Sequence, residues 1–294
     1  MDTGKTSRKL PKVKEVSEFL NRVRYIRDDC FKFPSDDPWE PWFRGHQNAA
    51  WELKPKLYRG RRGSVPLADK LRKAEDEIRE EFIKRAPILC EALPAGYEVR
   101  AEWEWYFMMQ HHKAATRLLD WTDGALIALY FAVKDNCEDN DAAVWVLDPY
   151  ELNKPTIGME WVIPPSATML EPKYQRLLAN WLPSRFPRKY SPLPPQVVAI
   201  EPTHVLRRMS SQHSCFTIHG GDPQALVELA RNGSPCLSKI EIAKSQVNKI
   251  ESELRRCGID ESTIYPDLDG LGASINARWG IREDGWRKNK KTTK

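Results

Sequence analysis

The chain has 294 residues, of which 41% are hydrophobic, 10% aromatic and 30% charged. This balance favours a packed globular protein and excludes disorder of the whole chain. The net charge of +5 does not describe a generally basic protein, because residues 1–14 and 282–294 each carry a net +4 and leave residues 15–281 at about −3. We therefore expect one folded part at 15–281 between two solvated basic tails.

The longest apolar run, residues 125–133, is too short to span a bilayer, and residues 1–14 lack the apolar stretch of a secretory signal. The six cysteines lie twenty residues or more apart. Such spacing is typical neither of a metal-binding pair of cysteines nor of a secreted disulfide scaffold. The sequence therefore predicts a cytoplasmic protein with reduced thiols and no membrane partner.

In the first half of the chain, apolar residues recur at intervals of three and four, which is typical of amphipathic helices. One later run of Leu and Ala is apolar on every side, which indicates a buried helix. The expected elements are helices over residues 13–25, 67–86 and about 98–112, a strand over 42–45, a loop over 59–63, a break over 113–122 and a buried helix over 125–133.

Proline divides the second half, because residues 149–195 hold ten of the chain's 22 prolines. Regular elements there must be short, and we expect a Pro-rich insertion or lid. The other expected elements are strands over residues 143–147, 196–201, 215–219 and 237–243 and helices over 204–212 and 244–257, the last ending before Gly258. Helices and strands alternate without regular βαβ spacing, so the sequence predicts an α+β domain with a small central sheet flanked by helices.

The first of three segments suited to chemistry is residues 42–47, Trp-Phe-Arg-Gly-His-Gln. Arg44 offers a rigid fork of donors for a phosphate or carboxylate, and Gly45 allows a close backbone approach. An arginine paired with a structural carboxylate at a strand end would give the same pattern. Both interpretations stay open at this point.

The second segment, residues 110–122, places polar and charged side chains between two apolar helices. These helices draw the segment toward the core, where polar groups need partners. We expect Arg117 and Asp120 to satisfy each other, either as a structural corner or as part of a site. His111 and His112 lack the further ligands of a metal site, so no metal is expected.

The third segment, residues 204–217, leads from a predicted helix into a predicted strand. Gln212 and Ser214 fall at this junction, where side chains often line a cleft. A nucleophile pair of Cys215 and His213 is not expected.

Together these segments resemble the FRG domain family of bacterial and phage proteins, which is named for a Phe-Arg-Gly triplet. The resemblance extends over most of the chain. The residues that carry it are Phe43-Arg44-Gly45, residues 51–57 and Arg59, Gln110-His111, residues 116–122 and 128–132, Gln212, Phe216-Thr217, and residues 258–259 and 263–271.

The opening motifs are also similar, more weakly, to those of arginine-type ADP-ribosyltransferases. That similarity implies an ADP-ribosyltransferase-like sheet and NAD as substrate, with Arg44 on the phosphates, Tyr130 or Trp121 against nicotinamide, and Gln212 near the reacting ribose. No Glu-x-Glu follows in the third segment. The resemblance implies catalytic roles for Arg44, Gln110, His111 and Gln212 and ligand contacts from Phe43, Gly45, Thr116, Arg117, Asp120, Trp121, Tyr130, Ser214 and Phe216.

In this interpretation the protein is an NAD-consuming effector or toxin of a bacterial phage-defence system, with a protein or nucleic acid as acceptor. The alternative is a binding module for a nucleotide or nucleic acid, or a protein-sensing subunit of such a system. Residues 174–190 favour nucleic acid, because cations and aromatic rings alternate there without acids. The cations of this stretch are Arg176, Arg185, Arg188 and Lys189; its aromatic residues could equally cover the core.

Overall fold

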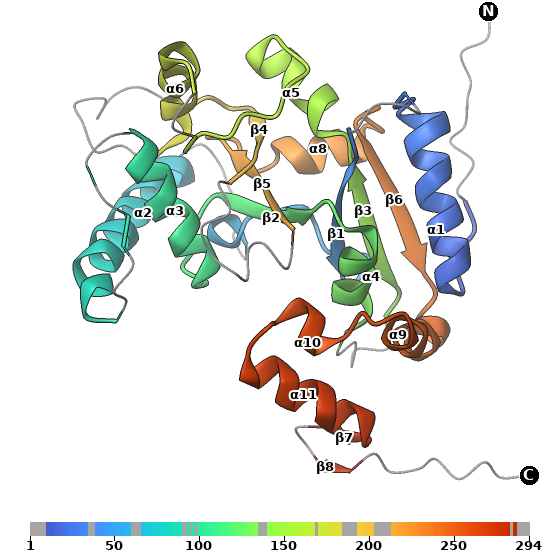
Figure 1. The fold of residues 1–294 in the computed structure, drawn as a ribbon. Helices are drawn as coiled ribbons and strands as arrows, with labels where there is room; N and C mark the ends of the chain where they lie inside the picture. The colour runs from blue at the N-terminus through green and yellow to red at the C-terminus, as the bar shows by residue number, and fades with distance from the viewer. Residues whose placement is uncertain are drawn as a thin grey trace, which may run out of the picture.

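The structure is a computed structural model. It describes residues 10–34, 39–59, 66–89, 93–94, 96, 99–134, 140–167, 170–183, 193–202, 213–282 and 285–286. Within these ranges one antiparallel sheet of six strands is flanked by helices, which confirms the predicted α+β class (Figure 1). The strands are β1 (Trp42–His46), β2 (Leu118–Thr122), β3 (Ala142–Leu147), β4 (Val197–Ile200), β5 (Ser214–His219) and β6 (Leu237–Ile242), in the spatial order β4-β5-β2-β1-β3-β6.

The strand β2 corrects the sequence analysis, which expected only a break at residues 113–122. Four of its five residues are buried, and Asp120 alone is exposed. The pattern of a strand covered on both faces lacks the alternation that marks a half-buried strand. Its polar residues therefore suggested an irregular corner.

The helices predicted from periodicity are confirmed within a few residues. They are α1 (Val16–Tyr25), continued by a π-helical turn (Ile26–Cys30), α2 (Pro66–Arg85), α3 (Val99–His111), α4 (Ala125–Val133) and α9 (Val247–Arg256). The structure adds α5 (Pro149–Ile157), α6 (Pro172–Leu178), α8 (Ala225–Arg231), α10 (Glu261–Ile264) and α11 (Leu268–Arg278), and a small hairpin of β7 (Ile281–Arg282) and β8 (Gly285–Trp286). The helix expected at 204–212 lies outside the described residues, and so does most of the loop at 59–63.

The three largest apolar clusters hold most of these elements together. One lies between α1, α4, α9 and the strands β1, β3 and β6, and a second between α3, α6 and the strands β2, β4 and β5. The third, on the opposite face of the sheet, includes residues of α5 and α8. The sheet is thus covered on both faces, which fits the near-continuous apolar character of its strands.

The described parts of the Pro-rich segment contribute to this core, and their helices are short, as predicted. Leu178 and Trp181 are buried against β4 and β5. Asn153 of α5 donates to the backbone oxygen of Ala199 in β4 at 2.9 Å and accepts from its backbone nitrogen at 2.7 Å. The segment is therefore anchored to the sheet through α5.

Candidate functional site

The two central strands of the sheet separate soon after they meet. Each of the five residues of β1 pairs with β3, but only one pair, Phe43 and Thr122, joins β1 to β2. Arg44 therefore does not continue the ladder opposite Trp121. Backbone groups at such a split are released from the ladder and can bind side chains or ligands.

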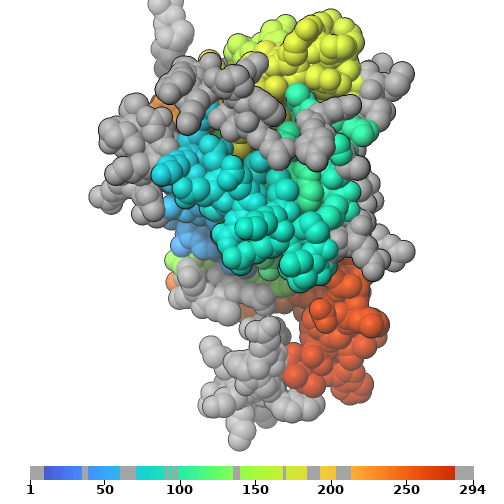
Figure 2. All heavy atoms as spheres, turned by 90° about the vertical axis from the view of Figure 1, so that its left-hand side faces the viewer, coloured from blue at the N-terminus to red at the C-terminus, as the bar shows by residue number. Residues whose placement is uncertain are grey.

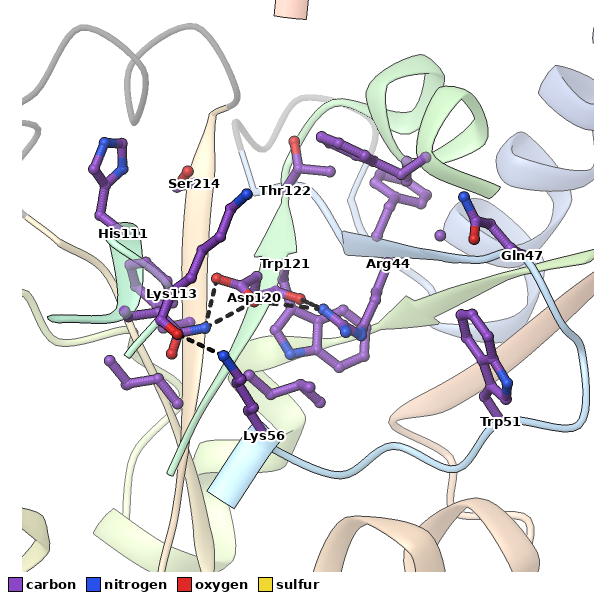
Figure 3. Close-up of a pocket in the computed structure, with 18 of the residues that line it drawn as sticks. Arg44, Gln47, Trp51, Lys56, His111, Lys113, Asp120, Trp121, Thr122 and Ser214 are labelled. Atoms are coloured by element: carbon purple, nitrogen blue, oxygen red, sulfur yellow. Dashed lines mark hydrogen bonds and ion pairs between the residues drawn. The ribbon is translucent and has the colours of Figure 1, made fainter. Parts of the chain in front are cut away.

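A pocket of about 470 Å³ occupies the split between β1 and β2 (Figure 3). Its wall combines residues of both strands with residues of α4, of β5, of the end of α3 and of the segment that follows β1. The volume is within the range of about 300 to 1,000 Å³ that is common for small-molecule sites.

Arg44 reaches across the split from β1. Its Nη1 donates to the backbone oxygen of Asp120 at 2.6 Å and lies 3.8 Å from the carboxylate of the same residue. Burial lowers the pKa of Arg44 to about 10, and the Asp120 charge opposes this shift without cancelling it. The guanidinium is therefore charged at neutral pH, but the protein compensates its charge incompletely.

His46 supports Arg44 from the same strand. The Nε of Arg44 donates to Nε2 of His46 at 3.1 Å. Burial, and next the Arg44 charge, lower the pKa of His46 to about 3, so the ring is neutral at physiological pH. With Nε2 accepting, the ring proton is assigned to Nδ1. His46 thus orients the guanidinium without supplying a negative charge.

Asp120 extends into the pocket from β2, and its side chain is 56% exposed. The amide nitrogen of Gln110, in the last turn of α3, donates to both carboxylate oxygens at 2.9 Å. The amide oxygen of Gln110 accepts from the hydroxyl of Thr116, which fixes the amide orientation. Among the described lining residues Asp120 is the one carboxylate, and two elements hold it in place.

Three further cations, Lys56, Arg59 and Lys113, lie on the exposed rim of the pocket. Lys56 Nζ donates to the backbone oxygen of Lys113 at 2.6 Å, which joins the two rim segments. Lys113 has a left-handed backbone with φ of 63°. Positive charge is therefore concentrated here, although residues 15–281 have a net charge of about −3.

Aromatic residues form much of the remaining wall. Phe43, Trp121 and Phe216 are buried, whereas Trp51 is 47% exposed. The indole nitrogen of Trp121 donates to the hydroxyl of Thr217 at 3.0 Å, so this ring is fixed from behind. Phe131 and Tyr265, both half-buried, also line the pocket. The Lys134 ammonium lies 4.9 Å from the centre of the Tyr265 ring, so Trp51 is the most exposed aromatic ring of the described lining.

Gly45 permits the close approach that the sequence predicted, and the partner is a helix. A Cβ at this position would lie 2.1 Å from the backbone oxygen of Ala128 and 2.6 Å from the backbone nitrogen of Ala132. Helix α4 therefore rests directly on β1. This contact brings Ala128 and Phe131 to the pocket wall.

The expected pair of Arg117 and Asp120 is not formed, which corrects the sequence analysis. Arg117 is 1% exposed and does not line the pocket. Its Nε lies 2.8 Å from a carboxylate oxygen of Glu75 in α2, and its Nη1 donates to the backbone oxygen of His219 at 2.6 Å. Arg117 precedes β2 and is drawn into the core by a carboxylate from a distant helix.

Most of the other predicted site residues do meet. Those that line the pocket are Phe43, Arg44, Gly45, Gln110, His111, Asp120, Trp121, Ser214 and Phe216. Thr116 contacts it only through Gln110, and Tyr130 is buried in the cluster around α4. Gln212 lies outside the described residues.

The stretch proposed for nucleic acid is described only in part. Arg176 is exposed, but Arg185, Arg188 and Lys189 lie outside the described residues. Trp181 is buried and Tyr174 packs on the same apolar cluster. Two of the rings proposed to stack on bases therefore contribute to the core.

The sequence analysis did not assign Gln47, Trp51, Lys56, Arg59, Lys113 or Tyr265 to the site. Trp51, Lys56 and Arg59 belong to the series of residues that carries the family resemblance, which was an available signal. Tyr265 belongs to the same series, within residues 263–271. Lys113 gave no signal, because its position depends on its left-handed turn.

A second cavity, of about 510 Å³, has the opposite charge. Glu151, Asp222 and Glu228 line it, and its described lining contains no Lys, Arg or His. The positive charge of the pocket at the β1–β2 split is thus a local feature, not a property of every cavity in this protein.

A family model matches residues 40–141, from just before β1 to just before β3. The matched model is that of the FRG domain. The match covers roughly a third of the chain and includes Arg44, Gln110 and Asp120. It does not extend to Gln212 or to residues 263–271, whose similarity to the family remains an expectation. No curated protein and no solved structure matches the chain.

The described part of the chain lacks both a metal-binding cluster and a membrane-spanning helix. It holds no group of three or more His, Cys, Asp or Glu side chains arranged to bind a metal ion. None of its helices combines the length and apolar character needed to cross a membrane.

Proposed function

We propose that the pocket at the β1–β2 split binds NAD or a related pyrophosphate nucleotide, and that the protein consumes NAD in an ADP-ribosyltransferase-like reaction. The observation that carries this proposal is the incomplete compensation of Arg44. Its side chain is 15% exposed, and its carboxylate partner lies at 3.8 Å and is itself half-exposed. A phosphate oxygen beside the guanidinium would supply the charge and the acceptor that the protein leaves out.

The rest of the wall supports a ligand with both phosphates and planar rings. Lys56, Arg59 and Lys113 lie on the rim, and the exposed Trp51 is part of the wall. Aromatic side chains stack on bases, and cations attract the phosphates. This combination favours a nucleotide over an inorganic anion, which would not need the aromatic wall.

Asp120 supports the catalytic part of the proposal. When nicotinamide leaves NAD, positive charge develops on the ribose, and a fixed carboxylate nearby would stabilise it. Gln110 holds the Asp120 carboxylate toward the pocket, and Arg44 lies on its other side. We propose that Asp120 takes the role for which the sequence has no Glu-x-Glu, with His111 and Gln212 as further candidates.

The family resemblance supports the biological setting. FRG domains are expected in bacterial and phage proteins, so we propose that the chain is the effector or toxin of a phage-defence system. A protein or nucleic acid would then accept the ADP-ribose, or water would accept it in a simple hydrolysis.

Titration calorimetry with ADP-ribose and NAD tests the binding step. Arg44→Ala should weaken binding by about 10- to 150-fold, the effect of losing a hydrogen bond to a charged group. Arg255→Ala on α9, which removes an arginine that pairs with Glu251 on the surface, is the matched control. Wild-type protein that binds neither compound, or Arg44→Ala protein that binds as well as wild type, would contradict the proposal.

Labelled NAD in cell extract tests turnover, because the extract supplies an acceptor. Wild-type protein should release nicotinamide, and Asp120→Asn should bind ADP-ribose but release nicotinamide at least tenfold more slowly. Equal rates for the two proteins would remove Asp120 from the reaction.

A non-catalytic nucleotide or nucleic-acid module is the second candidate, and the basic rim with the exposed Trp51 favours it. In that case nicotinamide release is absent, and oligonucleotide affinity falls steeply with salt through counterion release. Four phosphate contacts on a single strand predict a log-log slope of about −3. Two sets of substitutions show which residues make the contacts. If the stretch at 174–190 makes them, the slope becomes flatter when its four cations are neutralised, which are Arg176, Arg185, Arg188 and Lys189. If the pocket rim makes them, the slope becomes flatter when Lys56, Arg59 and Lys113 are neutralised.

A further inference from the structure

Helix α11 carries an apolar stripe that faces away from the rest of the protein. Leu268, Ile275 and Trp279 are 84%, 46% and 68% exposed, and Leu271 beside them is 47% exposed. Gly272 lies in the same row, and a Cβ there would meet nothing within 4 Å. Positions 268, 272, 275 and 279 follow the spacing of four, three and four residues that forms the seam between paired helices.

The opposite side of α11 is fixed. A Cβ at Gly270 would lie 2.0 Å from the backbone oxygen of Tyr265, so α11 packs directly on the end of α10. Ser274 is buried and its hydroxyl donates to the Asp260 carboxylate at 2.8 Å. In Figures 1 and 2 the C-terminal helices extend from the part of the molecule that contains the sheet. The apolar side of α11 is thus held outward.

We propose that this α11 stripe, formed by residues 268, 271, 272, 275 and 279, is the contact between two copies of the chain, with the two helices antiparallel. A row of large exposed apolar side chains is typical of an interaction surface. Gly272 lies near the middle of the row, where it lets the two helices approach closely.

The charges at the two ends of α11 identify the partner as a second copy. Asp267 caps the N-terminus of α11 and Asp269 lies in its first turn, whereas Arg278 is its last residue. Along the sequence, residues 282–294 add six Lys or Arg and two acids. An antiparallel pair places the acidic end of each helix near the basic end of the other. A parallel pair would bring like charges together, which disfavours it.

The size of the contact predicts a reversible dimer. Helix α11 has 11 residues, so it spans about 16 Å. A single pair of such helices buries less surface than a standard stable interface, so we expect a dissociation constant on the order of micromolar. The dimer does not depend on the proposed nucleotide site.

Sedimentation equilibrium over a wide range of concentrations tests the contact. Ile275→Lys should weaken the dimer at least tenfold, because it places a charge in the apolar stripe. Ala273→Lys is the matched control, since Ala273 is exposed on α11 but lies outside the stripe. Wild-type protein that stays monomeric throughout, or Ile275→Lys protein that dimerises like wild type, would overturn the proposal and leave the stripe to a different partner.

Cysteine cross-linking tests the orientation, in a background where every cysteine except the buried Cys215 and Cys236 is serine. In the antiparallel dimer the two copies of residue 268 are about 16 Å apart along the helices, too far for a disulfide. Leu268→Cys and Trp279→Cys should therefore cross-link when mixed and not when alone. Efficient cross-linking of Leu268→Cys with itself would overturn the antiparallel arrangement.

Discussion

Two arginines of this protein lie next to the same strand and differ in almost every other respect. Arg117 is buried beside Glu75, which lies at 2.8 Å, and donates to two backbone oxygens, those of His219 and Trp181. Arg44 lies in the pocket, where its carboxylate partner is 3.8 Å away. Burial alone lowers the pKa of each arginine, but Glu75 reverses the shift at Arg117 and Asp120 does not at Arg44.

This difference separates an arginine that stabilises the fold from one that can bind a ligand. The charge and the donors of Arg117 are used by the protein, so it joins α2 to the sheet. The charge of Arg44 is only partly used, so an anion in the pocket would gain from it. Each arginine also has a neutral histidine close by, since burial lowers the pKa of both His46 and His219 to about 3.

The largest expected effect is on stability, at the Arg117 pair. Glu75→Ala should lower the free energy of unfolding by about 3 to 5 kcal/mol, because it leaves a buried guanidinium without its counter-charge. Urea unfolding at neutral pH measures the change.

Glu77→Ala is the control for this substitution, since Glu77 lies on the same helix with a side chain that is 68% exposed. It should change the free energy of unfolding by less than about 0.5 kcal/mol. A similar small effect for Glu75→Ala would mean that the Arg117 pair does not hold α2 to the sheet.

The next largest effect is expected at Gly45 in the pocket wall, where β1 contacts the backbone of α4. Gly45→Ala should cost about 1 to 3 kcal/mol, because the added methyl group meets the backbone of α4 and must displace the helix. Gly221→Ala is the control, because a Cβ there would meet only Leu193, at 3.4 Å or more, so the free energy of unfolding should change by less than about 0.5 kcal/mol. Thermal unfolding of the two variants in parallel distinguishes them, and equal melting temperatures would show that α4 yields freely.

Local pattern predicted the helices well, since α2, α3 and α4 each have an apolar stripe or a wholly apolar run. It missed β2, because a strand buried on both faces has no alternation. It also gave Arg117 the wrong partner. Glu75 lies 42 residues earlier in the chain, and nothing in either segment specifies which distant carboxylate enters the core.

The site was predicted to a similar extent. Arg44, Gln110 and Asp120 were found because they interrupt apolar segments, and such polar groups meet around the pocket. The rim cations were not found, because exposed lysines on a loop resemble any solvated surface. The position of Lys113 depends on a left-handed turn that no glycine marks.

The two neutral histidines predict how stability depends on pH. The pKa of each is about 3 in the folded protein, and an unfolded histidine titrates near 6.5, so only the unfolded chain takes up these protons between the two values. Stability is therefore complete above about pH 6.5 and falls as the pH drops toward 3, by up to about 1.4 kcal/mol per pH unit for each histidine. Urea unfolding between pH 7 and pH 4.5 measures the slope.

His219→Phe tests how much of this pH dependence of stability comes from His219, the histidine next to Arg117. Both ring nitrogens of His219 are buried without a partner among the described residues, so an apolar ring can replace it. The variant should show a slope smaller by about one proton, with the His46 contribution retained. If the free energy of unfolding of the variant depends on pH as steeply as that of the wild type, the acid sensitivity comes from other groups.

The smallest expected effect on stability is at Asp120, the carboxylate of the pocket pair. Asp120→Ala should change the free energy of unfolding by less than about 1 kcal/mol, because a half-exposed ion pair contributes little and water can replace it. Its backbone oxygen still accepts from Arg44, since that hydrogen bond does not involve the side chain. Urea unfolding of Asp120→Ala beside Glu75→Ala gives the comparison in one experiment. If Asp120→Ala were as destabilising as Glu75→Ala, the pocket pair would belong to the fold in the same sense as the core pair, and the charge of Arg44 would no longer indicate a ligand.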